Sequence, residues 1–542
     1  MSAEQRFESQ RIDHLGIVAG ICHEIGLMNA IDEAVGPSGR KVSCGAAVQA
    51  MVLNCLGFTS RAMYLMPQYL HNKPVDLLIT PGLTAEDFND DTLGRSLDQL
   101  FEAGVTEVFA QVAQRALAVY GIEHRFYHLD STSFHVHGQY ESGEAQPGLI
   151  EITYGYSKDH RPDLKQVVVN LITGHRSQLP VWMEALSGNQ SDKASFPQSI
   201  QAFCEQMNAK EACFFVVDSA LYSAANLESL GDTRWLTRVP ETLAEAKRLL
   251  AGAASQAMTE LPDGYAYLEV PSNYGGVAQR WLVVYSPQAA QREEKALQRR
   301  VTKEKKAAQR AWRKQRSQTF NCSEDAEAAL TAVQKKWKYH QVKGKVVPIT
   351  RYPSPGRPAA TATPQVVGFR LDGEVEVSES LLEQARCGQG RFILATNELR
   401  ADLLPPDTIL AQYKAQAVSV ERGFRFLKDP LFFADSLFLK NPGRIMALAM
   451  TMVLALLVYA LAERKLRTRL QETGESIPNQ IGKETQTPTM RWVFQLFEGI
   501  DLLLVWQDDK LIHREVLNLK PIHLAVLRLL GPPVENCYLL GS

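Results

Sequence analysis

The longest apolar run in the chain, residues 445–462 (IMALAMTMVLALLVYALA), constrains the fold more than any other segment. A run of this length approaches that of a helix that spans a bilayer, and Arg444 and Arg464 flank it with positive charge. The alternative is a helix buried on all sides in a large protein core. The chain has 542 residues, of which 45% are hydrophobic and 22% charged, and this composition is ordinary for a soluble globular protein of several domains. We therefore expect a buried helix and no membrane partner.

The cysteines, the N-terminus and the net charge further restrict the class of protein to which this chain can belong. The eight cysteines are scattered without close pairs, so they form neither a zinc pattern nor a compact disulfide framework. The first residues, MSAEQRFESQRID, are polar and lack the apolar stretch of a signal peptide. We expect a cytoplasmic protein. The net charge of -2 gives no general attraction to polyanions, so a nucleic acid would have to be bound by local basic patches.

Hydrophobic periodicity separates a helical segment from an α/β segment near residue 120. In residues 1–120 we expect Ser43 and Asp91 each to cap an apolar helix. In residues 121–239, short runs rich in Val and aromatic residues predict strands, and a helix is expected before the last of them. The strands are expected at 125–129, 166–172, 179–183 and 213–217, and the helix at 196–207. A meander followed by helix–strand alternation predicts an α/β domain with a mixed sheet.

The pattern of residues 240–386 predicts an inserted, β-rich domain. A β pair is expected around SNYGG at 265–285. The strongly basic stretch 292–316 and the run 324–339 predict a basic helical hairpin, after which come a Pro-rich loop, RYPSPGRP, and further short strands.

The α/β pattern resumes in residues 387–470, with a strand at 391–397 and helices from 407 onward. Residues 471–489 are polar and contain Gly and Pro, which indicates a linker. We expect residues 471–542 to form this linker and a small C-terminal subdomain.

Two aspartates stand where apolar strands are expected to end. Asp130 ends one in FYHLDSTSF, and Asp218 ends another in CFFVVDSALYS. A carboxylate at the end of a buried strand costs desolvation free energy unless a partner compensates, and a divalent cation is one such partner. The alternative for each residue is an Asp that only caps the turn or helix that follows.

A third acidic residue, Glu421, lies in the predicted helix SVERGFRFLKDPLFF. Helical spacing places Glu421, Arg425 and Lys428 on one face, beside an apolar stripe of Val420, Phe424 and Leu427. The plain alternative is a solvated face with one Glu–Arg pair. Two-metal phosphoryl transfer needs several carboxylates that converge from separate elements, so the three acids together favour such a site.

The order of several motifs resembles that of bacterial insertion-sequence transposases of the DDE type. The chain is most similar to the superfamily named after insertion sequence four and, within it, to the family named after insertion sequence sixteen-thirty-four. The resemblance extends from about residue 10 to the C-terminus. It rests on NDDTLGRSLDQLFEAG, YHLDSTSF, GYSKDHRPDLKQ, GNQSDKASF, VVDSALYS, FILATN and VERGFRFLKDPLF, in that order.

The superfamily signature around the Glu is met only in its second half. It consists of Tyr, two residues, Arg, three residues, Glu, six residues and Lys. Glu421 and Lys428 have the right separation, but Tyr413 is one place too early and Ala417 stands where Arg is expected. The resemblance therefore transfers a role to Glu421 and Lys428 and none to Tyr413.

The resemblance implies a fold and a metal site. The fold is an α/β RNase H-like mixed-sheet catalytic core with an inserted β-rich domain and a helical N-terminal domain. Asp130, Asp218 and Glu421 would bind two Mg²⁺ ions, for which Mn²⁺ can substitute. These metals would activate water to nick the transposon end and then activate the freed 3′-hydroxyl to attack target DNA.

The resemblance also implies partners: double-stranded DNA with its terminal inverted repeats, target DNA, and a second copy of the chain in a homodimeric synaptic complex in the bacterial nucleoid. Lys428 and Arg425 would hold a phosphate near the cut. Lys158 and Arg161 are further candidates for the DNA backbone, against the alternative of a charged turn at a sheet edge. The helical N-terminal domain would bind the DNA ends, and the basic stretch 292–316 would contact the backbone or form a solvated face.

Other residues carry weaker signals. His135 and His137 alternate after Asp130 but have no third partner at metal-ligand spacing. The serines near the aspartates lack the GxSxG context of a hydrolase. Some relatives clasp a flipped base with a Trp of the inserted domain; the candidates are Trp235, Trp281 and Trp312, and the alternative is that each is a core residue.

Three other functions compete with an active transposase. A DNA-binding protein descended from a transposase would bind the ends without cutting them. A stand-alone RNase H-like nuclease would cut without dependence on particular end sequences. A membrane protein would fractionate with membranes. The intact set of three acids and the Glu–Lys spacing favour the active transposase.

Overall fold

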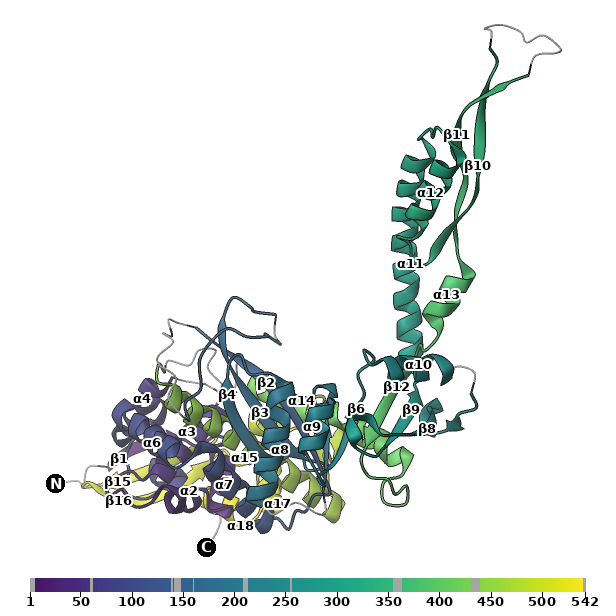
Figure 1. Cartoon of the computed structure of the whole chain (residues 1–542). Coiled ribbons are helices and arrows are strands. Elements are labelled where there is room, and N and C mark those ends of the chain that lie inside the picture. Colours follow the sequence, from purple (N-terminus) through teal and green to yellow (C-terminus); the bar gives the residue numbers. More distant parts are fainter. Residues whose placement is uncertain are drawn as a thin grey trace.

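A nine-stranded mixed sheet joins segments that lie far apart in the sequence (Figure 1). The computed structural model describes residues 5–58, 62–137, 140, 148–158, 160–207, 213–253, 256–353, 363–429 and 439–539, without the side chains of 417–419. In spatial order the strands are β4 (Pro180–Ser187), β3 (Lys165–Gly174), β2 (Phe126–Val136), β5 (Phe214–Val217), β6 (Arg234–Arg238), β12 (Arg391–Thr396), β9 (Gln279–Tyr285), β8 (Ala266–Ser272) and β7 (Thr259–Glu260).

The first half of the sheet has the predicted meander and alternation. β2, β3 and β4 pair in antiparallel fashion, and β5 and β6 then continue from β2 in parallel. The helices α8 (Asp192–Met207) and α9 (Ala224–Ser229) make the connections between the parallel strands, as parallel pairing requires. The mixed α/β fold class and all four strands predicted in this segment are confirmed, although β2 is longer than expected.

The extra length of β2 corrects one expectation about the candidate site. β5 ends at Val217, but β2 continues to Val136 because it stays paired with β3 as far as Lys165. Asp130 therefore lies inside β2 and not at its end, and the prediction that it ends a strand is wrong. Asp218 does follow the last residue of β5.

The segment between β6 and β12 divides between the sheet and a projecting arm. β8 and β9 form the expected β pair around SNYGG and extend the main sheet, because β9 pairs with β12. Residues 287–386 form the arm, which stands away from the body in Figure 1. It consists of α11 (Pro287–Arg316), α12 (Ser323–Gln334), the hairpin of β10 (His340–Arg351) and β11 (Gln365–Val377), and α13 (Glu379–Arg386). α10 (Ala244–Gly252) precedes this part.

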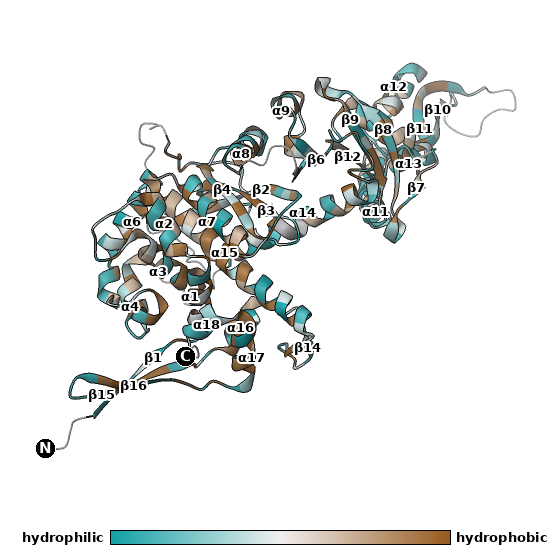
Figure 2. Cartoon of the chain, turned by 90° about the horizontal axis from the view of Figure 1, so that it is seen from below, coloured by the Kyte–Doolittle hydropathy of each residue, from teal (hydrophilic) through white to brown (hydrophobic). Residues whose placement is uncertain are grey.

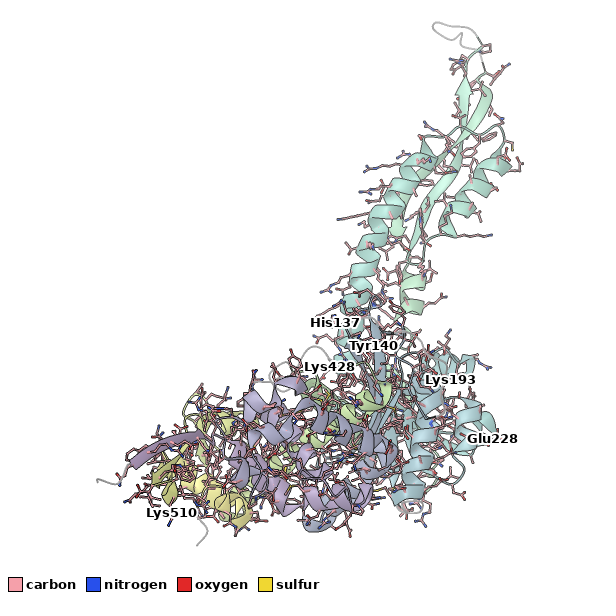
Figure 3. All side chains as sticks on the ribbon, turned by 90° about the vertical axis from the view of Figure 1, so that its left-hand side faces the viewer. His137, Tyr140, Lys193, Glu228, Lys428 and Lys510 are labelled. Carbon is pink, nitrogen blue, oxygen red and sulfur yellow. The ribbon has the colours of Figure 1, made fainter. Side chains whose placement is uncertain are left out.

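The arm has a small core of its own. Trp312 of α11, Ala326 of α12, Val342 of β10 and Leu371 of β11 are buried against one another. Most of the other side chains of α11 are exposed, and Figure 3 shows many side chains that project from the arm. The two predicted helices are confirmed, but α12 ends at Gln334, five residues before the end expected from the apolar pattern.

The N-terminal helices surround the largest hydrophobic core. They are α1 (Leu15–Glu24), α2 (Leu27–Val35), α3 (Cys44–Leu56), α4 (Met66–Leu70), α5 (Val75–Leu78), α6 (Asp90–Glu102) and α7 (Val105–Val119). Ser43 caps α3 as expected, since its side chain accepts a hydrogen bond from the Ala46 amide at 3.1 Å. The expected cap at Asp91 is wrong. Asn89 is the last extended residue before α6 and accepts from the Thr92 amide, so Asp91 already lies in the first turn.

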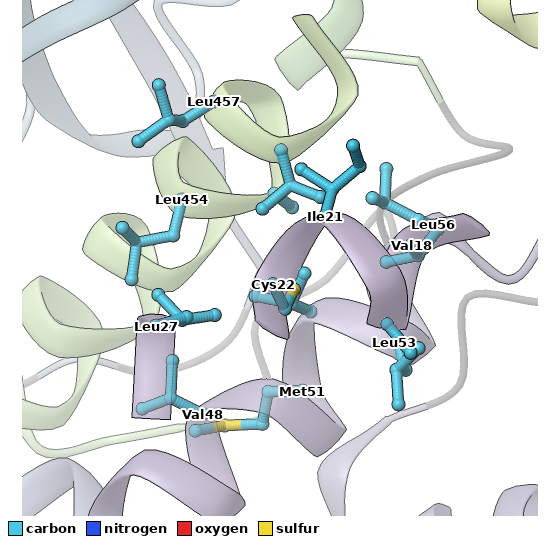
Figure 4. Packing of buried hydrophobic residues seen from close by; sticks show 14 of the residues in the cluster. Val18, Ile21, Cys22, Leu27, Val48, Met51, Leu53, Leu56, Leu454 and Leu457 are labelled. Atoms are coloured by element: carbon cyan, nitrogen blue, oxygen red, sulfur yellow. The ribbon is translucent and has the colours of Figure 1, made fainter. Parts of the chain in front are cut away.

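The apolar run is confirmed as a buried helix. It lies in α15 (Pro442–Thr473), the one single helix in the described residues that is long and apolar enough to cross a membrane; α1 and α2 meet that test only together, as a pair bent by 55°. Within α15, 89% of the most apolar window is buried inside the protein. Figure 4 shows Leu454 and Leu457 of α15 packed with Ile21 of α1 and Val48 of α3.

The two ends of the described chain share this core. β1 (Gln5–Arg11), which the sequence pattern did not predict, pairs with β15 (Asp501–Gln507), and β15 pairs with β16 (Lys510–Leu517). This small sheet projects from the body beside both termini (Figure 2). The expected linker contains a short hairpin of β13 (Ile477–Pro478) and β14 (Glu484–Thr485). The helices α16 (Met490–Leu496), α17 (Pro521–Leu530) and α18 (Pro532–Asn536) then pack on α15 or α1.

Gly20 is a point of close backbone contact between the two ends. A methyl group at this position would lie 2.6 Å from the Val534 Cα of α18. We expect Gly20→Ala to lower the free energy of unfolding by about 1–3 kcal/mol, because two backbones would have to separate. The measurement is urea unfolding followed by circular dichroism. Gly252→Ala is the matched control: a methyl group at this helical position would meet no atom within 4 Å, and we expect no loss there. Equal unfolding midpoints for the two variants would contradict the tight α1–α18 contact.

Candidate active site

Asp130 and Asp218 lie side by side on neighbouring parallel strands. The last register pair between β2 and β5 is Leu129 with Val217, one residue before each aspartate. Alternation along the strands puts Asp130 on the face of Phe126, and Asp218 on the face of Phe214. Both phenylalanines are buried together with residues of α14 (Pro406–Leu427). The two carboxylates therefore share the sheet face that α14 covers.

Local hydrogen bonds fix both carboxylates. Asp218 accepts from the Ala220 amide at 2.8 Å and so caps the short 3₁₀ turn Ser219–Leu221. One oxygen of Asp218 thus caps the turn that follows, which was the alternative to a metal ligand. Asp130 accepts from the Ser131 amide at 2.7 Å. Each residue keeps a second carboxylate oxygen that these backbone bonds do not use.

A third carboxylate, Asp192, completes what we call the carboxylate cluster: Asp130, Asp192 and Asp218. Asp192 is the first residue of α8, and Ser131 donates a short hydrogen bond to it. Its charge acts on the carboxyl groups of both other members. Asp192 lies in the motif GNQSDKASF. Because it begins a helix, it has the sequence pattern of a capping residue and not of a member of an acidic site.

The Lys158 ammonium lies inside this cluster. Its Nζ is 3.6 Å from Asp130 Oδ1 and 3.1 Å from Asp192 Oδ2, and it donates to the Ser131 carbonyl at 2.7 Å. Lys158 was predicted to contact the DNA backbone; the structure places it at the carboxylates instead. A single ammonium compensates only part of the charge of three carboxylates.

Burial makes the cluster electrostatically costly. It raises the pKa of the Asp130 carboxyl to about 6, although Lys158 and the Ser131 amide oppose this. Burial also raises the pKa of Asp218, and the negative charge of Asp192 adds to the effect. A divalent cation would stabilise the ionised forms more than one ammonium does, and carboxylate oxygens are the ligands that Mg²⁺ prefers. The carboxylates at the end of β5 can therefore supply some of the oxygen ligands of a hard divalent ion.

Glu421 lies on α14 at the margin of this region. The apolar stripe of Val420, Phe424 and Leu427 is buried as expected, and Gln416 donates to the Leu129 carbonyl beside Asp130 at 3.3 Å. Glu421 itself is exposed. Within the described residues, no three His, Cys, Asp or Glu side chains lie close enough together to hold a metal ion. The structure thus brings Asp130 and Asp218 together, but Glu421 does not complete a group of three ligands with them.

The other predicted DNA contacts have different surroundings. Arg425 is exposed, and the Glu421–Arg425 pair of the plain alternative is absent from the ion pairs of the described residues. Lys428 follows the last turn of α14 and is half-buried. Arg161 forms a two-pronged contact with Asp163 at 2.9 and 2.8 Å on an exposed turn.

The histidine and tryptophan candidates have structural partners. His135 lies 2.9 Å from the Ser157 hydroxyl, measured from Nε2, while His137 is exposed. Trp235, Trp281 and Trp312 are all at most 5% exposed. All three tryptophans are therefore core residues in this structure, which was the alternative to a role in holding a base.

Comparison with known proteins gives two matches to family models. Residues 122–458 match the family described as "Transposase DDE domain", and residues 7–114 match a "Domain of unknown function (DUF4277)". Among solved structures, the chain is similar to piggyBac transposase in its synaptic complex with hairpin DNA, with 8% identity and a TM-score of 0.37 over 91% of this chain and 82% of that one. A search of curated proteins found no match. The match to the transposase DDE domain covers more than half of the chain.

The raised pKa of Asp130 leads to a test of the metal-free protein. The folded-state pKa of about 6 lies above the usual value for Asp, so the folded state binds this proton more tightly than the unfolded state. The contribution of Asp130 to the free energy of unfolding therefore falls as the pH rises from about 4 to about 6. We expect Asp130→Asn, which removes this effect, to stabilise the protein by about 1–3 kcal/mol at neutral pH and hardly at all near pH 4.

Thermal unfolding in the presence of a chelator measures this difference across the pH range. Asp163→Asn is the matched control, because hydrogen bonds from Arg161 lower the pKa of the exposed Asp163 to about 2. We expect no gain in stability from that substitution at neutral pH. A neutral-pH melting temperature of Asp130→Asn at or below that of the wild type would contradict the burial cost assigned to Asp130.

Proposed function

The chain belongs to the family of DDE-domain transposases, and from that membership we propose that it cuts DNA at the ends of its own mobile element and joins the freed 3′-hydroxyl to a target DNA. The observation that carries this proposal is the placement of Asp130 and Asp218 at adjacent positions of two parallel strands. The ordered motifs support assignment to the insertion-sequence-four superfamily and to the family named after insertion sequence sixteen-thirty-four. The mixed sheet supports an RNase H-like core.

We assign the metal ligands to Asp130, Asp218 and Glu421, with two Mg²⁺ ions that Mn²⁺ can replace. Bound divalent ions supply activation of the attacking oxygen and stabilisation of the leaving one. The face that Asp130 and Asp218 share supports their part in this assignment, since both carboxylates are held by backbone amides with one oxygen to spare.

Helix geometry places Glu421 beside the buried stripe of α14. At about 100° per residue, Glu421 points to one side of the stripe of Val420, Phe424 and Leu427, and Arg422 points away from it. Arg422 donates at 2.9 Å to Gln178, in the turn between β3 and β4. That turn lies at the end of the sheet where β2 begins.

Positive side chains around the cluster can hold phosphates. We propose that Lys158, now ion-paired with Asp130 and Asp192, turns to a DNA phosphate when a metal ion takes over the charge compensation. Arg161 and Lys428 are assigned to the DNA backbone near the cut, and Arg425 to the DNA backbone in general. Their charges attract phosphates irrespective of base sequence.

The remaining parts of the chain suit DNA of greater length. The helical N-terminal domain (1–120) is proposed to bind the terminal inverted repeats, and the inserted domain (240–386) to contact the backbone through α11. Along that helix, Lys295, Arg299, Lys303 and Lys306 follow one another at helical spacing on one side. The two core segments (121–239 and 387–470) would act in a homodimeric synaptic complex in the bacterial cytoplasm, at the nucleoid, with residues 471–542 bracing the N-terminal helices.

An excision-and-insertion assay in bacteria tests the proposal. A marker is flanked by the DNA ends that neighbour the gene, and the wild type is compared with Asp130→Ala, Asp218→Ala and Glu421→Ala. We expect each substitution to reduce movement of the marker by at least about 100-fold, because each removes a metal ligand. Glu228→Ala, an exposed acid labelled in Figure 3, is the control and should move the marker like the wild type.

Each outcome of this assay assigns a role. Movement that survives one of the three substitutions removes that residue from the metal site. Because Glu421 does not complete a ligand group with the two aspartates in the structure, the rival function is a DNA-binding protein that no longer cuts. If nothing moves and the purified wild type still binds its ends, that rival replaces the proposal.

Removal of metal gives a second, independent test. We expect end cleavage by the purified protein to stop when a chelator is added and to return with excess Mg²⁺ or Mn²⁺, because the buried carboxylates need a divalent ion to hold and activate the reacting oxygens. Cleavage is measured on a labelled duplex that carries the element's end. Undiminished cleavage in the chelator would contradict the metal-dependent mechanism.

A further inference from the structure

A second basic site lies where α14 meets α15. A cavity of about 430 Å³ opens between α14, α15, the turn at residues 175–179 and the segment that begins α16. Six arginines line it, and we call the site the arginine pocket: Arg176, Arg422, Arg425, Arg464, Arg467 and Arg491. Arg425, which the sequence placed with the phosphate near the cut, lines this pocket.

The acidic residues of the arginine pocket leave much of this charge uncompensated. Glu463 pairs with Arg422 and, at 3.0 Å, with Arg467. Asp429 lies 3.1 Å from Arg491. These are the two acids that line the cavity, so six positive and two negative side chains leave an excess of four positive charges. Arg176, Arg425 and Arg464 have no ion pair among the residues that the structure describes.

Neighbouring groups respond to this positive field. Burial, together with the nearby charge of Arg464, lowers the pKa of His124 to about 4. Burial also lowers the pKa of Arg467, and the charge of Arg422 acts in the same direction. An anion in the pocket would relieve the repulsion that these arginines exert on one another.

We propose that the arginine pocket binds backbone phosphates of duplex DNA, as a contact separate from the carboxylate cluster. Guanidinium groups form planar forks that match phosphate oxygens, and they keep their charge at any physiological pH. The arginines come from four separate parts of the chain around an open cavity, which suits several phosphates along a strand. This inference rests on the proposed function, because it takes DNA to be the polyanion that the protein meets.

The position of the pocket indicates that it contacts a different stretch of DNA from the stretch that is cut. Gly174, just before the turn that carries Arg176, pairs with Tyr127 near the start of β2. Asp218 follows the end of β5, which runs parallel to β2. The pocket and the carboxylate cluster therefore lie toward opposite ends of the same strands.

The test is DNA binding by the full-length protein with the double variant Arg176→Ala/Arg464→Ala. A labelled duplex of unrelated sequence is the probe, since contacts to phosphates are blind to sequence. We expect the dissociation constant to rise roughly tenfold at moderate salt. The slope of log affinity against log salt concentration should fall by about 1–2, because each lost phosphate contact removes close to one released counterion.

Arg469→Ala is the matched control. Arg469 lies on the same helix as Arg464, its substitution removes one arginine charge, and it is ion-paired with Glu472 outside the pocket. We expect the wild-type affinity and salt slope for this variant. Circular dichroism and the melting temperature establish that all the variants are folded.

The outcomes separate this proposal from the proposed function. An affinity and salt slope of the double variant equal to those of the wild type would overturn the pocket as a DNA contact, whatever the excision assay shows. If inorganic phosphate raises the melting temperature of the wild type but not of the double variant, while DNA binding is the same in both, the pocket binds a small anion and the DNA proposal is wrong. Loss of DNA affinity with intact protein supports it, even if the marker never moves in bacteria.

Discussion

Burial of α15 is the interaction on which the rest of the structure depends. Its apolar middle section contacts N-terminal helices, strand β4, helix α14 and the C-terminal helices, so it joins parts of the chain that the sequence separates. Each large aliphatic side chain removed from water contributes about 1.5–3 kcal/mol, and α15 buries many of them, among them Leu454, Leu457 and Leu461. A helix that is apolar all round can be stable in water only if other elements surround it completely. The N-terminal helices, the sheet and the C-terminal helices together provide that cover.

The site depends on a second constraint, the parallel pairing of β2 with β5. This pairing fixes the relative position of Asp130 and Asp218 through backbone hydrogen bonds, with no need for contacts between the side chains. α14 then packs across the same face through Val420 and Phe424, which brings Glu421 to the margin of the cluster. Because α14 and α15 also pack on each other, the core that stabilises the fold also orients the helix that carries the third acid.

Sequence reasoning succeeded where local pattern decides the structure and failed where distant contacts do. The strands at 166–172 and 213–217, the cap at Ser43 and the buried helix at 445–462 follow from short-range periodicity and capping chemistry. β1 could not be predicted, because its polar strand is stable only through pairing with β15 at the other end of the chain. The length of β2 depends on its continued pairing with β3. Asp192 and the arginine pocket were missed for the same reason: their members are far apart in sequence, and each one alone resembles a helix cap or a solvated charge.

The carboxylate cluster is stabilised less well than the rest of the interior. Three acids share one ammonium, burial raises the pKa of two of them, and Asp218 uses one oxygen to cap a turn while the other is left for a ligand. Such an arrangement lowers stability, and proteins keep it where function needs it. The arginine pocket has the opposite charge imbalance at the other end of the same strands. Negative charge that needs a cation and positive charge that needs an anion thus lie in two separate sites. A nucleic-acid substrate with its bound metal ions supplies both, so binding DNA would relieve the two imbalances together.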